Sequence, residues 1–83
     1  MKMVYFAWVR EKVGVSSEEL APPADVATVT GLIEWLRGQG AGYEAAFADL
    51  ATVRVAVNQV YAALDAPVSA NDEVAFFPPV TGG

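Results

Sequence analysis

Apolar and polar residues alternate along residues 2–10 of the chain, which is the pattern of a β-strand. Lys2 and Arg10, the charged residues of this stretch, fall on the same side as Phe6 and Trp8. Because charged side chains rarely point into a core, the other side is expected to face inward. The pattern predicts a first strand with an unusually apolar outer face. Its inward residues are expected to be Met3, Tyr5, Ala7 and Val9.

A turn, a second strand and a helix are predicted next. Residues 11–14 end in glycine and predict a turn, and residues 16–20 predict a short polar strand. Thr28 then offers a hydroxyl oxygen for a helix N-cap. The apolar residues behind it are spaced three or four apart, which is typical of a helix with one buried stripe. They are Val29, Leu32, Ile33 and Leu36, and Gly38 follows as a stop signal.

The second half of the chain returns mainly to strand patterns. The predicted elements are a short helical turn over residues 43–50, strands over 53–57 and 59–62, a loop over 65–72 and a last strand over 73–77. Strands on both sides of one helix favour a single sheet packed on that helix. We therefore expect an α+β fold of the β-grasp type, with a mixed sheet of four to five strands on one main helix. A ferredoxin-like split βαβ fold is the alternative, but it needs two long helices.

The composition excludes several classes of function. The 83 residues include ten acidic and five basic side chains, no histidine and no cysteine, for a net charge of −5. Phosphate backbones repel such a chain, so nucleic-acid binding is not expected. Disulfides, thiolate catalysis and Cys or His metal sites are excluded, and the commonest general base near neutral pH is missing. We expect a non-catalytic protein that suits a basic partner.

Targeting and membrane segments are also not expected. No stretch approaches the ~18 apolar residues of a membrane span. The apolar start contains a positive residue, as a signal peptide would, but it is short, rich in β-forming residues and followed by charges. We expect a cytoplasmic protein without membrane contact.

The chain ends in two glycines behind two prolines. The prolines cannot donate to a sheet ladder, so the last strand is expected to end at Phe77. Glycines can enter a channel too narrow for side chains, which leaves the terminal carbonyl of Gly83 open to attack in a partner's active site. The sequence predicts a domain over residues 1–77 and a thin projecting tail over residues 78–83.

Three segments carry a resemblance that spans the chain in the same order. They are Phe6-Ala7-Trp8-Val9-Arg10-Glu11 with Gly14, then Val57-Asn58-Gln59, then the whole stretch from Asp72 to Gly83. With these segments the chain resembles the small, sulfur-carrier subunit of molybdopterin synthase, a ubiquitin-like family. The tail is the specific part of the resemblance, and the family's fold is the β-grasp.

The resemblance implies a chemical role for the end of the chain. An ATP-using activating enzyme would adenylate the carboxylate of Gly83, behind Gly82, and convert it to a thiocarboxylate. The large subunit would use that sulfur to build the dithiolene of molybdopterin from a cyclic pyranopterin phosphate. Two carriers would flank a large-subunit dimer in a heterotetramer. No cofactor or metal is implied for this chain, because ATP and zinc belong to the activating enzyme.

Aromatic residues are expected to form the partner-binding surface. Phe6, Trp8, Tyr61 and Phe77 would gather on one sheet face if the first and last strands are neighbours, and such exposed groups mark protein interfaces. The resemblance implies large-subunit contacts for Phe6, Arg10 and Phe77. Alternatively, Trp8 or Tyr61 covers the edge of the core and Arg10 is a solvated charge.

The tail residues assigned to the partner are Pro78, Pro79, Val80 and Thr81. The remaining cations, Lys2, Lys12, Arg37 and Arg54, are expected to serve solubility.

Other functions remain open. A ubiquitin-like modifier would form isopeptide bonds with lysines of other proteins, and it shares the activation of a diglycine end. A plain interaction domain would carry an inert tail. A sulfur carrier for thiamine or transfer-RNA thiolation is a further alternative, but the Phe-Phe-Pro-Pro context fits those relatives less well.

Overall fold

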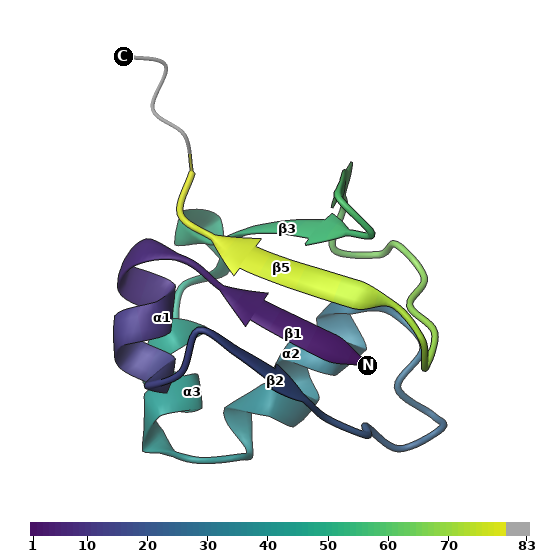
Figure 1. Cartoon of the computed structure of the whole chain (residues 1–83), viewed down its shortest axis with the longest axis horizontal. Coiled ribbons are helices and arrows are strands. Elements are labelled where there is room, and N and C mark those ends of the chain that lie inside the picture. Colours follow the sequence, from purple (N-terminus) through teal and green to yellow (C-terminus); the bar gives the residue numbers. More distant parts are fainter. Residues whose placement is uncertain (80–83) are drawn as a thin grey trace.

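The last strand of the chain lies in the middle of the sheet. β5 (Glu73–Phe77) pairs in parallel with β1 (Lys2–Tyr5) and antiparallel with β3 (Arg54–Val57). The outer strands are β2 (Ser17–Glu19), antiparallel to β1, and β4 (Val60–Ala62), antiparallel to β3. The sheet order is β2-β1-β5-β3-β4, and Figure 1 shows β1 and β5 side by side.

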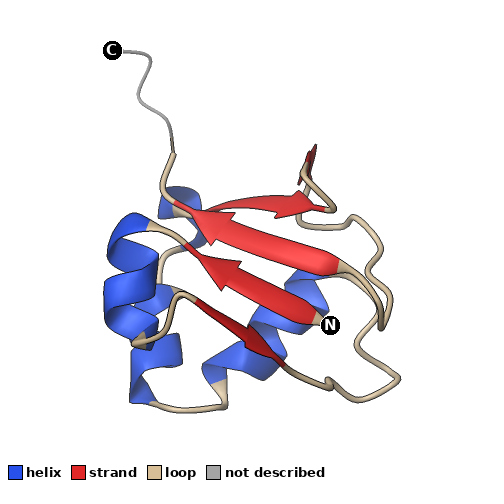
Figure 2. Ribbon diagram, in the orientation of Figure 1, coloured by secondary structure: helices blue, strands red, loops and turns tan. Residues whose placement is uncertain are grey.

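Three α-helices and one 3-10 turn connect the strands in this computed structural model, which describes residues 1–79. The helices are α1 (Ala7–Val13), α2 (Val29–Arg37) and α3 (Ala41–Ala46), and the turn covers Leu50–Thr52. They gather on one side of the strands (Figure 2). This arrangement is a β-grasp, as the sequence predicts, and the ferredoxin-like alternative is wrong.

One apolar core joins the helices to the inner face of the sheet. Phe76 of β5 stacks on Tyr5 of β1 with ring centroids 6.0 Å apart, and it meets the edge of Phe47 at 4.9 Å. The four stripe residues expected of the main helix are all buried, and Thr28 caps that helix by accepting a hydrogen bond from the Gly31 N–H at 3.1 Å. The other buried apolar residues are Met3, Val9, Ala46, Val53, Val55, Ala56, Val68 and Val74.

The first strand is shorter than its pattern predicts. It ends at Tyr5, and the expected strand over residues 6–10 and turn over residues 11–14 are instead α1 and its end. Ala7 has a φ of 51°, which turns the chain out of the sheet, and it is exposed where the strand pattern placed it inward. Gly14, with a φ of 100°, ends the helix by donating its N–H to the Arg10 carbonyl.

The signal for this helix was present in the sequence. Val9 and Val13 are four residues apart, and Val9 is fully buried while Val13 packs against the core. The charged residues between them, Arg10, Glu11 and Lys12, are exposed. The two patterns cannot be told apart here, because a spacing of four residues keeps Val9 and Val13 on one side of a strand and also on one side of a helix.

Helices α1 and α3 approach each other at a glycine. A Cβ added at Gly42 would overlap the backbone carbonyl oxygen of Lys12. Backbone atoms in two packed helices cannot move apart without disturbing the core on either side of them. Gly42 is therefore required where α3 crosses the end of α1.

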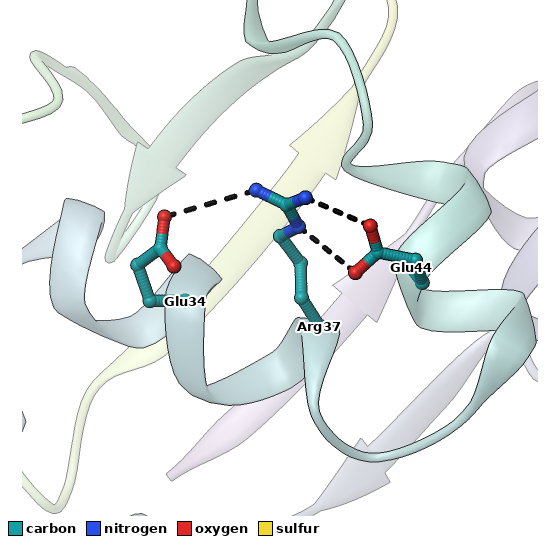
Figure 3. A network of polar contacts seen from close by, with 3 residues as sticks. All are labelled: Glu34, Arg37 and Glu44. Atoms are coloured by element: carbon teal, nitrogen blue, oxygen red, sulfur yellow. Dashed lines mark hydrogen bonds and ion pairs between the residues drawn. The ribbon is translucent and has the colours of Figure 1, made fainter.

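An ion-pair network holds the end of α2 against α3 (Figure 3). Arg37 donates from Nε and Nη2 to the two carboxylate oxygens of Glu44, at 3.1 and 2.8 Å, and its Nη1 lies 3.8 Å from Glu34. The hydrogen bonds to Glu44 raise the pKa of Arg37, and the same bonds lower the pKa of Glu44. Arg37, expected to serve solubility, is thus a structural cation at the surface.

A polar cluster ties β1, β2 and α3 together at the rim of the core. The hydroxyls of Tyr5 and Tyr43 both donate to Oε2 of Glu18, at 2.8 and 2.7 Å. Burial raises the pKa of Tyr5 above its ordinary value, and the hydrogen bond to Glu18 adds to the shift. Desolvation, with the same acceptor, raises the pKa of Tyr43 to about 12. Both phenols are held in their neutral forms.

We predict that Gly42→Ala destabilises the domain. The added methyl group overpacks the α1–α3 contact, and we expect a loss of about 1–3 kcal/mol in the free energy of unfolding by urea. Gly38→Ala is the matched control, because Gly38 has a φ of −79° and its added Cβ would lie 3.4 Å from its nearest neighbour. That variant should change the free energy by less than about 1 kcal/mol. Equal losses in both variants would contradict the close-contact argument.

We predict that the domain loses stability in alkali because of Tyr43 and Tyr5. An unfolded tyrosine ionises near 10.0, whereas folded Tyr43 keeps its proton to about 12. The unfolded state therefore releases protons first, and the free energy of unfolding should hold below pH 10.0 and fall between 10.0 and about 12. Tyr43→Phe should make this fall shallower, measured by urea denaturation across the range. Tyr61→Phe, outside the cluster, serves as the control, and an equal effect there would refute the assignment.

Candidate functional site

The sheet face that points away from the helices carries Tyr61 and Phe77, two of the predicted partner-binding residues. Alternation along β5 places Phe76 in the core and Phe77 on this outer face. The strand register pairs Phe77 of β5 with Arg54 of β3, and it pairs Ala56 of β3 with Tyr61 of β4. Tyr61 is 78% exposed, so a large aromatic side chain stands in solvent here.

Three aromatic residues belong to this face, and two of them pack together. The rings of Tyr61 and Phe77 are 5.8 Å apart at 45°. Phe6 follows β1 with an extended backbone, and its N–H donates to the Phe76 carbonyl at 3.0 Å. It continues the side-chain alternation of β1, which puts it on the same face as Phe77, and it is 50% exposed. We call Phe6, Tyr61 and Phe77 the aromatic face.

A groove opens on the β4 side of the aromatic face. Its volume is about 340 Å³. The residues that line it are Arg54, Val55, Tyr61, Ala62 and Phe77. Four of these are apolar or aromatic and one is charged, so the groove combines an apolar wall with a single cation. We call it the Arg54 groove.

Trp8 and Arg10 do not lie on the sheet with these aromatics. Both are on α1, outside the strand in which the sequence analysis placed Trp8. Trp8 is half-buried and packs against the core, which agrees with the alternative that it covers the edge of the core, and its contact with a partner stays a prediction. Arg10 is exposed, and it makes no ion pair with the charged groups of residues 1–79. Its contact with a partner stays a prediction.

The last strand ends where the sequence predicts. β5 ends at Phe77, and Pro78 and Pro79 follow it without strand structure. The other tail residues, Val80, Thr81, Gly82 and Gly83, lie outside the described residues. The division of the chain after residue 77, the projecting tail and the chemical role of Gly83 therefore stay predictions.

Two of the segments that carry the family resemblance meet at the start of β5, where Asn58 and Asp72 form a hydrogen-bonded clamp. Asn58 turns the chain from β3 to β4 with a φ of 52°, and Gln59 follows with 68°, the signs of a tight hairpin turn. The Asn58 side chain donates to Asp72 and accepts from the Glu73 N–H, both at 3.0 Å. Asp72 also accepts from the Ser69 N–H at 2.7 Å. These residues hold the start of β5, so their role is to position the strand.

The described residues hold little chemistry of their own. Within residues 1–79, no group of three or more acidic, histidine or cysteine side chains is close enough to hold a metal ion. No helix in that part of the chain has the length and apolarity to cross a membrane.

Sequence comparison places the chain in a known family. The model of the ThiS family matches residues 3–83. The chain belongs to the ThiS family. It is 43% identical over 83 residues to the molybdopterin synthase sulfur carrier subunit of Escherichia coli K12, covering 100% of this chain and 99% of the relative. Membership in this family of small carriers agrees with the expectation that the chain is not an enzyme on its own.

Solved structures confirm the fold. The crystal structure of SAMP1 from Haloferax volcanii matches with a TM-score of 0.78 and 32% identity, over 100% of this chain and 98% of that one. A putative molybdopterin converting factor, subunit 1, from Pyrococcus furiosus matches with a TM-score of 0.76 and 34% identity, covering 95% of both chains. The ubiquitin-like β-grasp expected from the sequence is therefore confirmed.

The structure predicts different stability costs for the two neighbouring aromatics. Tyr61→Ser should change the free energy of unfolding by less than about 0.5 kcal/mol, because the ring is already in solvent. Phe77→Ser should cost about 1–2 kcal/mol, because that half-buried side chain sits in the central strand. Urea denaturation of both variants checks the difference. An equal cost for the two would show that Tyr61 is a packing residue after all.

Proposed function

We propose that this chain is the sulfur carrier subunit of a molybdopterin synthase. The observation that carries the proposal is the full-length match to a relative of that name, with 43% identity over 83 residues. The geometry supports it, since β5 runs through the middle of the sheet and delivers the chain to the diglycine end from beside the aromatic face. The carrier supplies position, and its partners supply catalysis.

The proposed chemistry uses the carboxylate of Gly83. A free carboxylate resists nucleophiles because its charge is delocalised, so an activating enzyme first joins it to AMP from ATP and releases pyrophosphate. A sulfur nucleophile then attacks the acyl carbon and AMP leaves, which splits one hard step into two easier ones. The product is a thiocarboxylate. The large subunit draws one sulfur from each of two such thiocarboxylates to build the dithiolene of molybdopterin from a cyclic pyranopterin phosphate, and water returns each Gly83 to a carboxylate.

The aromatic face and the tail residues from Pro78 to Gly82 are the proposed contacts with the large subunit. Exposed aromatics close to a reactive end give a partner a surface on which to orient that end. The net charge of −5 suits partners that are basic overall, because long-range attraction speeds the encounter. The heterotetramer, the activating enzyme and the cytoplasmic location stay predictions.

A second candidate function is protein modification. The chain shares its fold and 32% sequence identity with SAMP1, a small archaeal modifier protein. Activation of a diglycine end is common to both routes, and they diverge at the nucleophile. A sulfur donor yields a carrier, and a lysine amine yields a conjugate.

The deciding experiment is intact-mass analysis of the purified chain after incubation with an activating enzyme, ATP and a sulfur donor. We expect one oxygen of the protein to be replaced by sulfur, and the loaded protein to form molybdopterin when the large subunit and the pyranopterin substrate are added. A mass that does not change would count against the carrier function. Conjugates of higher mass that persist in denaturant would favour the modifier.

A chain extended by one residue beyond Gly83 is the matched control. Its folded domain should melt at the same temperature, because few core contacts involve a terminal residue. Sulfur loading should be lost, because the terminal carboxylate then belongs to the added residue and Gly83 no longer has a free carboxylate to be activated. Sulfur transfer by the extended chain would contradict this role of the end.

A further inference from the structure

Arg54 is the one charged residue of the Arg54 groove, and it has no acidic partner in the described chain. The salt bridges of residues 1–79 involve the N-terminus and Arg37 only. The acidic residue nearest to Arg54 in sequence is Asp49, and its Oδ1 accepts from the Ala51 N–H at 3.0 Å. The chain carries a net charge of −5, so a positive charge next to Tyr61 and Phe77 differs from the acidic character of the chain as a whole.

The guanidinium of Arg54 is held in place by weak bonds at one end. Its Nη1 donates to the carbonyls of Ala51 and Val53, at 3.2 and 3.3 Å. No residue of the described chain accepts from Nε or Nη2. These two donors form the edge that binds both oxygens of a carboxylate in parallel. The arrangement is a pre-oriented fork whose receiving edge is available.

We propose that the Arg54 groove receives a carboxylate-bearing segment of the synthase large subunit, with an Asp or Glu on Arg54 and an apolar neighbour against Tyr61 and Phe77. This inference rests on the proposed function and names the chemistry of the partner's contact. The groove continues the aromatic face, and Phe77 belongs to both, so one partner surface covers them together.

Charge complementarity sets what the partner must carry at this point. A partner that is basic overall is drawn to the acidic chain, but a Lys or Arg placed in this groove would meet a like charge. An acidic residue there gains two charge-assisted hydrogen bonds and lies in the groove that the two aromatic side chains also line. The groove therefore fixes the register of the complex and rejects carriers or partners without the matching charge.

The test is the dissociation constant between the carrier and the purified large subunit of the same organism, measured by calorimetry at low and high salt. Arg54→Gln should weaken binding about tenfold or more, because it leaves the partner's carboxylate unpaired. Arg54→Lys keeps the charge but loses the two-atom edge, so its dissociation constant should fall between the two. Binding by the wild type should also depend on salt more steeply than binding by Arg54→Gln.

Lys12→Gln is the control, since it removes one exposed positive charge from α1. It should change the dissociation constant by less than about twofold, as expected for an isolated surface charge. Melting temperatures of all variants should stay close to that of the wild type.

The remaining outcomes separate the groove from the function. If the wild type binds the large subunit and accepts sulfur, and Arg54→Gln has the same dissociation constant, the proposed role of the groove is overturned and the proposed function is not. A wild type that neither binds the large subunit nor accepts sulfur would overturn both. Self-association of the carrier that Arg54→Gln abolishes would replace the proposed occupant by a second copy of this chain.

Discussion

The parallel pairing of β1 with β5 is the interaction on which the rest of the structure depends. It runs from Lys2 opposite Glu73 to Tyr5 opposite Phe76, and it joins the two ends of the chain. The Phe6 N–H extends it by one more bond to Phe76. Because of this pairing, the strand that leads to the C-terminal residues lies in the middle of the sheet, with a neighbouring strand on each side.

Core and surface are built from adjacent residues of the same strand. Phe76 is fully buried between Tyr5 and Phe47, and Phe77 turns the opposite way into the aromatic face. The clamp around Asn58 fixes where this strand starts, so it also fixes which phenylalanine points outward. A slip of the strand by one residue would exchange the buried and the outward-facing phenylalanine.

Much of the fold was readable from local patterns, and so was part of the site. The cap at Thr28, the hairpin around Asn58 and the end of β5 at Phe77 follow from the turn and capping chemistry of neighbouring residues. The neighbouring positions of Tyr61 and Phe77 were predicted correctly. Trp8 was misplaced, because α1 has a pattern that a strand also satisfies. Arg54 was assigned to solubility, because a single cation in an alternating strand resembles an ordinary surface charge, and its groove exists only in the folded chain.

The sequence by itself determined the β-grasp order of elements, the lack of histidine and cysteine chemistry, and the diglycine end, because these depend on composition and on residues close in the chain. Only the tertiary structure decided that Ala7 leaves the sheet, that Trp8 packs on the core and that Arg54 shares a groove with Tyr61 and Phe77. The physical reason is that periodicity records which residues share a side of an element. Whether that side is covered depends on strands and helices far away in the sequence.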